Sequence, residues 1–163
     1  MEDGHPFSED WAPTITPDQM EAATWASLIH EARGILLFNH SFGGSCGSAH
    51  VLSDCGAEMR NRFAALTAKI RALAPVLNSQ SYEWTAGTGL DTMLKADGGY
   101  LYLFAMVGQT GAAGAHTLSL PGSITATAQV LNENRTVDVV GSGLTDTFGD
   151  TNTVHIYQIP FGP

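Results

Sequence analysis

The sequence predicts an α+β protein in which two helices and one buried strand precede a small antiparallel β-sandwich. The first observation is the helical spacing of apolar residues in two segments before residue 78. The second is an apolar run between those segments that is too short for a helix. The third is a change, from about residue 79 onward, to short strand-like segments separated by turn residues. We therefore expect one unit over residues 1–78 and a β-sandwich over residues 79–163.

The first predicted helix covers residues 16–32. Thr16 suits the N-cap, Pro17 suits the first helical position, and acidic residues follow in the first turn. The apolar residues recur near helical spacing, at Met20, Trp25, Leu28, Ile29 and Ala32. This segment is therefore predicted to bury one face.

The apolar run "GILLF", residues 34–38, follows this helix almost at once and leads into Asn39 and His40. Its apolar residues are continuous rather than alternating, which is typical of a strand covered on both faces, as in a parallel sheet. We expect a buried strand here, although one strand cannot form a sheet by itself.

A second, longer helix is predicted over residues 54–77. Its apolar stripe consists of Met59, Phe63, Leu66, Ile70, Leu73 and Leu77. Four basic residues lie elsewhere on the helix surface: Arg60, Arg62, Lys69 and Arg71. Pro75 should end or kink the helix.

From residue 79 the pattern predicts strands. The segment "LDTMLKADGGYLYLFAMVG" indicates a hairpin around the "ADGG" turn, in which Tyr100, Tyr102 and Phe104 lie opposite Leu101 and Leu103. Further strands are predicted at "HTLSL", "ITATAQVL", "RTVDVV" and "TVHIYQI", separated by "PG", "NEN" and "GSG" turns. These short strands together predict a small antiparallel sandwich.

The charge pattern excludes several classes of partner. A formal net charge of −9 would repel a phosphate backbone or an anionic membrane, whereas a neutral sugar is compatible with it. The first residues lack the basic and apolar parts of a signal peptide, so the sequence leaves localisation undetermined. The histidines show no metal-ligand spacing, and "GQTGAAGAH" lacks the Lys-Ser/Thr ending of a P-loop. We expect no metal and no cofactor.

Two cysteines, Cys46 and Cys55, close a short loop that contains glycine and serine. The ends of such a loop could meet in a disulfide, and a disulfide would imply an oxidising compartment. The alternative is a pair of free thiols at the surface.

The order of several segments resembles the C-terminal portion of a cellulase-like (β/α)8-barrel glycoside hydrolase. The segments are "MEDGHPFSED", "TPDQMEAATWASLIHEARGILLFNHSFGG", "IRALAPVLNS", "GGYLYLFAM" and "VLNENRTVDVVGSGLTDTFGDTNTVHIYQI". In that family the last barrel helices and the eighth strand are followed by a small β-sandwich. The resemblance thus implies a partial barrel remnant over residues 1–78, an accessory sandwich over residues 79–163, and a secreted parent enzyme.

The resemblance also implies roles for particular residues. Glu2, in an "E-x-G-H-P-F" context, is similar to the catalytic nucleophile, and His5 beside it to a substrate contact. Asn39 and His40 would lie at the mouth of the last barrel strand, where such barrels bind substrate. A retaining glycosidase needs two carboxylates about 5 Å apart, and the acid/base residue would belong to a strand that this chain lacks. The implied substrate is a β-linked oligo- or polysaccharide, and the chain alone is expected to be weak or inactive.

Two further expectations concern partners. The apolar residues 25–32 and 35–38 would be left uncovered without the rest of a barrel, which favours a homo-oligomer, with strands or helices exchanged between chains as one form. The alternative function is a non-catalytic carbohydrate-binding or protein-interaction module. In that case the aromatic residues Tyr82, Trp84, Tyr100 and Tyr102 would stack on sugars if they are exposed, whereas a buried row would indicate core packing.

Overall fold

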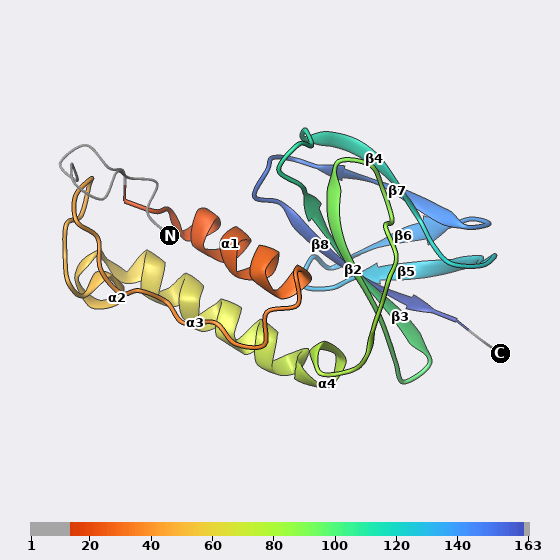
Figure 1. The fold of residues 1–163 in the computed structure, drawn as a ribbon, viewed down its shortest axis with the longest axis horizontal. Helices are drawn as coiled ribbons and strands as arrows, with labels where there is room; N and C mark the ends of the chain where they lie inside the picture. The colour runs from red at the N-terminus through yellow and green to blue at the C-terminus, as the bar shows by residue number, and fades with distance from the viewer. Residues whose placement is uncertain (1–13, 162–163) are drawn as a thin grey trace.

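Helices occupy the first half of the chain and strands the second in the computed structural model, which describes residues 14–161 (Figure 1). The helices are α1 (Pro17–Ile29), α2 (Val51–Asp54), α3 (Ala57–Ala72) and α4 (Ala74–Leu77). The strands are β1 (Ser81–Tyr82), β2 (Leu90–Asp97), β3 (Tyr100–Val107), β4 (Gly114–Ser119), β5 (Ala126–Val130), β6 (Arg135–Val139), β7 (Gly143–Phe148) and β8 (Val154–Pro160). The α+β class with an antiparallel β-sandwich is confirmed.

Helix α1 begins as the sequence predicts. Thr16 is the N-cap, and its hydroxyl accepts a hydrogen bond from the backbone N–H of Gln19 at 3.1 Å. The Gln19 side chain accepts in return from the backbone N–H of Thr16 at 2.9 Å, which completes a capping box. The helix ends at Ile29, three residues earlier than the pattern suggests, and Glu31 beyond it has a left-handed φ of 67°.

Helix α3 carries the predicted apolar stripe. Met59, Leu66 and Leu73 are buried, and Phe63 and Ile70 are partly buried against the same cluster. The helix stops at Ala72, and a separate short turn, α4, begins just before Pro75. The proline therefore interrupts the helix, as predicted, because it cannot donate a backbone hydrogen bond to the preceding turn.

Two sheets form the sandwich. Six strands lie in the order β1-β2-β3-β8-β5-β6, all antiparallel where they pair, and β4 and β7 form a separate two-stranded sheet. The predicted hairpin between β2 and β3 is present, with Asp97 opposite Tyr100 across Gly98 and Gly99. Both glycines have positive φ, 56° and 83°, as a tight two-residue hairpin turn of this kind requires. Strand β7 is an addition that the sequence patterns did not predict.

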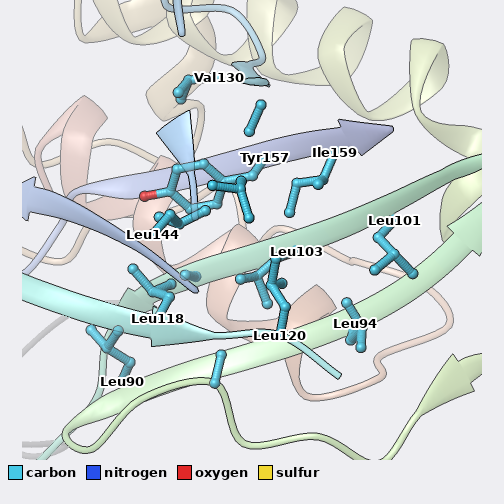
Figure 2. Packing of buried hydrophobic residues seen from close by; sticks show 14 of the residues in the cluster. Leu90, Leu94, Leu101, Leu103, Leu118, Leu120, Val130, Leu144, Tyr157 and Ile159 are labelled. Carbon is cyan, nitrogen blue, oxygen red and sulfur yellow. The ribbon is translucent and has the colours of Figure 1, made fainter. Parts of the chain in front are cut away.

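Two apolar cores lie on opposite faces of the central strands. Leu101 and Leu103 of β3 face the two-stranded sheet, where they share a core with Leu118 of β4 and Phe148 of β7. Figure 2 shows leucines of β2, β3, β4 and β7 gathered around Tyr157 and Ile159 of β8. The other face of β3 packs against the helices, and it includes Tyr102, Phe104 and Met106. The molecule therefore has three layers, with helices on one face of the larger sheet and the smaller sheet on the other.

The predicted buried strand at residues 34–38 is wrong. These residues have no strand assignment, and Leu36 is 98% exposed while Phe38 is 74% exposed. A strand needs a neighbouring strand to satisfy its backbone groups, and no other described segment lies in register beside this one. The single strand expected in the first 78 residues is therefore absent. No helix in the described part of the chain is long and apolar enough to cross a membrane.

Candidate functional site

The segment from Arg33 to Phe42 is the candidate site, because it contains several large exposed apolar side chains and the predicted substrate contacts Asn39 and His40. Ile35, Leu36, Phe38 and Phe42 are all exposed. The rings of Phe38, His40 and Phe42 lie together: the centroid of His40 is 5.6 Å from that of Phe38 and 4.1 Å from that of Phe42. We call residues 33–42 the open segment.

Asn39 and His40 are close in sequence but serve different contacts. The Asn39 Oδ1 atom accepts a hydrogen bond from the backbone N–H of Leu52 at 2.9 Å, which ties the open segment to α2. His40 belongs to the exposed ring cluster instead. Both residues line one cavity of about 370 Å³, whose other walls come from α1, α2, α3 and residue 15. Glu2 and His5 lie outside the described residues, so the structure does not relate them to this cavity.

A second and larger hollow also adjoins the open segment. Its volume is about 630 Å³, and α1, α3, α4 and strand β2 enclose it together with residues 31–37. The lining is mainly apolar: Leu28, Ile35, Leu36, Leu37, Phe63, Leu66, Ile70, Leu77 and Met93. The open segment thus lines two mainly apolar hollows.

One buried charge lies at the edge of the larger hollow. The Lys95 side chain is 3% exposed, and its Nζ atom donates to the Ser79 carbonyl at 3.0 Å and to the Ser81 hydroxyl at 2.6 Å. Ser81 in turn donates to Glu31 Oε1 at 2.5 Å, and Glu31 Oε2 is 4.0 Å from Nζ. This network compensates the ammonium group for its lost water. Sequence reasoning missed it, although a lone lysine inside a strand of buried residues was a usable signal.

A disulfide closes the loop that follows the open segment. Cys46 and Cys55 are bonded, with their Cα atoms 5.7 Å apart, and the loop between them contains α2. Thr14 adds two contacts, because its hydroxyl accepts from the backbone N–H of Cys46 at 3.1 Å and donates to the Gly43 carbonyl at 3.0 Å. The loop that follows the open segment is therefore fixed at several points.

A polar cleft of about 400 Å³ lies between residues of α1 and α3 on one side and residues 131–133 and 150–156 of the sandwich on the other. On its helical side, Glu21 accepts hydrogen bonds from Arg62 at 3.1 Å and from Lys69 at 2.7 Å. Burial raises the pKa of Glu21, but the hydrogen bonds and charges of Lys69 and Arg62 outweigh it, so that the pKa lies below its ordinary value. Two of the four basic residues expected on the solvent face of α3 thus join α3 to α1.

The predicted aromatic row does not form a flat exposed surface. Tyr82 is 50% and Tyr100 is 38% exposed, but Tyr102 is 8% exposed and Phe104 is fully buried against the helices. Trp84 donates from Nε1 to the Ser119 carbonyl at 2.8 Å and packs at the margin of the sandwich core. Tyr102 and Phe104 are therefore core residues. Among residues 14–161, no group of three or more His, Cys, Asp or Glu side chains is arranged to hold a metal ion.

Comparison with known proteins links this chain to two alpha-amylase structures, through the fold alone. No model of a protein family matches the sequence, and no curated protein matches it either. Among solved structures, the chain is similar to the alpha-amylase of Geobacillus thermoleovorans, crystallised with acarbose, with a TM-score of 0.63 and 14% identity. It is also similar to an Anoxybacillus alpha-amylase, with a TM-score of 0.59 and 12% identity.

These similarities cover most of this chain but a minor part of the neighbours. They include 91% of this chain and 34% of the Geobacillus enzyme, and 90% of this chain and 33% of the Anoxybacillus enzyme. The chain therefore spans about a third of the length of the structures it resembles. At these identities the similarity establishes a shared fold.

Proposed function

We propose that this chain is a glycoside hydrolase C-terminal portion, related to alpha-amylases, in which residues 1–78 complete a barrel and residues 79–163 form an accessory sandwich. In this proposal the open segment takes the place of the last barrel strand. The two amylase neighbours support a hydrolase of polysaccharides, but they give no support to a cellulase-like enzyme in particular. An α-linked glucan such as starch is therefore the first substrate to test, and a β-linked glucan is the second.

The observation that carries this proposal is the exposed apolar open segment, which lines two mainly apolar hollows. Ile35, Leu36 and Phe38 are exposed, and each Å² of apolar surface left in water costs about 25 cal/mol. The hollows of about 370 and 630 Å³ would accept further apolar side chains. Neighbouring barrel strands would satisfy both the side chains and the backbone of this segment.

The catalytic assignment follows from the barrel. Glu2 would be the nucleophile of a retaining pair, and His5, Asn39 and His40 would contact the substrate hydroxyls at the barrel mouth. The second carboxylate would belong to a part of the barrel that this chain does not supply. The chain by itself is expected to be weak or inactive on starch and on a β-glucan.

The activity test compares the chain with its Glu2→Gln variant on both polysaccharides. If the wild-type chain hydrolyses either polysaccharide, an equal rate in the Glu2→Gln variant would disprove the assignment of Glu2 as nucleophile. Affinity electrophoresis in gels that contain starch separates the alternative function from this one. Retardation of the chain would favour a non-catalytic carbohydrate-binding module, and an unretarded chain would contradict that alternative.

In isolation, a second copy of the chain is the occupant that we propose for the exposed face. The open segment carries no acidic residue between Arg33 and Phe42, so two copies could approach there without repulsion between carboxylates. Leu36 is the most exposed apolar residue of the segment, at 98%. We expect Leu36→Glu to convert a dimer into a monomer, measured by light scattering at micromolar concentration.

Val140→Glu is the matched control for this substitution. Val140 is 73% exposed and lies on the sandwich, away from the open segment, so the control adds the same charge without changing the face. A wild-type mass equal to one chain would contradict the homo-oligomer. Equal dissociation by both variants would mean that added charge, rather than the open segment, controls association.

A further inference from the structure

Five polar side chains meet at one edge of the sandwich, next to the polar cleft. They are Glu133 from the β5–β6 turn, Arg135 from β6, Asp146 from β7, and His155 and Tyr157 from β8. Arg135 donates to both oxygens of Asp146, at 3.1 and 2.7 Å, and its Nε atom donates to Glu133 at 2.7 Å. Such bidentate contacts fix the guanidinium in one orientation.

His155 is the one member of this cluster whose hydrogen bonds depend on its proton. Its side chain is 7% exposed. The Nε2 atom lies 3.1 Å from the Thr147 carbonyl, which can only accept, so Nε2 carries a hydrogen. The Nδ1 atom lies 2.6 Å from Glu133 Oε1 and 3.2 Å from Arg135 Nη2. When Glu133 is ionised, its carboxylate can only accept a hydrogen bond, whereas the Arg135 guanidinium can only donate one.

We propose that His155 is a proton-controlled contact that fastens the Glu133 side chain of the β5–β6 turn to β8 when the ring is protonated and leaves that side chain to Arg135 alone when the ring is neutral. In the protonated state Nδ1 donates to Glu133. In the neutral state the Nδ1 lone pair accepts from Arg135 and repels the Glu133 carboxylate. This inference is independent of the proposed function.

Two carboxylates and one guanidinium surround the His155 ring. With the proton, the two carboxylates of Glu133 and Asp146 are balanced by Arg135 and His155, whereas without it one negative charge is in excess. Tyr157 adds no charge, because burial and the neighbouring Asp146 charge raise its pKa. The other charged groups that line the cleft are Asp18 and Glu21, each paired with Arg62, together with Lys69 and Asp150.

The segment that the His155 contact would control is the short turn between β5 and β6. Two of its residues, Asn132 and Asn134, have left-handed φ values of 66° and 51°. The turn is joined to β8 by the hydrogen bond from Leu131 N–H to the Ile156 carbonyl, at 2.8 Å, and by the contact between Glu133 and His155. Arg135 also holds Glu133, at 2.7 Å, and this contact does not depend on the His155 proton. Asn132 and Glu133 also line the polar cleft. Release of Glu133 would therefore change both the charge and the shape of that cleft.

The test follows the side-chain nitrogens of His155 and the backbone amides of residues 131–134 by NMR, on the full chain, from pH 5 to pH 9. In wild type, as the pH rises, we expect the Nδ1 signal to change from that of a protonated nitrogen to that of a nitrogen without a proton. The amide signals of residues 131–134 should shift with the same midpoint. Glu133→Gln is the informative variant, because the new amide can donate to a neutral ring. We expect its turn amides to lose this pH-dependent shift.

His50→Gln is the matched control, since His50 is exposed and distant in sequence from the turn. The control should retain the shift of residues 131–134. Turn amides that do not follow the His155 signal in wild type would overturn the proposal, as would a ring that stays neutral from pH 5 to pH 9. A Glu133→Gln protein that titrates like wild type would overturn it as well. The wild-type titration decides the matter even if the variant does not fold.

Discussion

Strand β3 offers a direct test of whether the helices and the sandwich unfold together. Leu103 and Phe104 are neighbours on this strand, both 0% exposed, and they point into the two different cores. Replacing Phe104 by alanine empties the helical side, next to Trp25, whose ring centroid is 6.1 Å away. Replacing Leu103 by alanine empties the sandwich side. Because β3 belongs to both cores, we expect each substitution to destabilise the whole chain.

The expected cost follows from complete burial. Phe→Ala in a core lowers the free energy of unfolding by about 3–5 kcal/mol, and Leu→Ala by about 2–5 kcal/mol. For a chain of this size a loss of 3–5 kcal/mol corresponds to a fall in Tm of roughly 6–20 °C. Urea unfolding followed by circular dichroism measures the global change. Hydrogen exchange with mass spectrometry reports separately on the peptides of α3 and of β8.

One outcome would refute the reasoning. If Leu103→Ala accelerates exchange in β8 but leaves α3 protected, the two cores are energetically separate, and residues 1–78 and 79–163 behave as independent domains. Val140→Ala is the control. Because the Val140 side chain is 73% exposed, the free energy of unfolding of this variant should stay within about 0.5 kcal/mol of wild type.

Three further outcomes are expected. Thr16→Ala should lower the free energy of unfolding by about 1 kcal/mol in urea titrations, because it removes the N-cap of α1; an unchanged midpoint would contradict this. Burial raises the pKa of Asp146, but its hydrogen bonds, that from Arg135 first, outweigh burial and hold the pKa below its ordinary value. Asp146 therefore stabilises the fold above about pH 4, and this contribution is lost as the pH falls through the lowered value. Asp146→Asn should cost about 2 kcal/mol at pH 7 and show a weaker acid dependence, measured by urea midpoints from pH 2 to pH 7. Reduction of the bond between Cys46 and Cys55 should lower stability by about 2–3 kcal/mol, and a protein with both cysteines changed to serine should be insensitive to the reductant.

The sequence predicted the elements whose causes are local. The α1 cap depends on Thr16 and Gln19, three residues apart, and the β2–β3 turn depends on two adjacent glycines that can adopt positive φ. The division of β3 into two faces also follows from the alternation of side chains along a strand. It was confirmed, because Tyr102 and Phe104 pack against the helices while Leu101 and Leu103 fill the sandwich.

The errors concern elements whose partners are distant. Strand β7, "GLTDTF", has few apolar residues and was missed, because its stability comes from pairing with β4 and packing of Leu144 and Phe148. The strand at residues 34–38 was predicted from its apolar character, but it has no neighbour in the described chain. The cluster around His155 was missed as well, since residues from a turn and three strands come together only after the sheets have formed.

The sequence by itself determined the α+β class, the boundaries of α1 and α3 to within a few residues, and the hairpin, because helix caps, turn residues and side-chain periodicity act over short distances. The tertiary structure decided which apolar surfaces are covered. The run "GILLF" has the composition of a buried strand, but burial depends on what lies beside a segment. In this chain Leu36 and Phe38 therefore remain exposed to solvent.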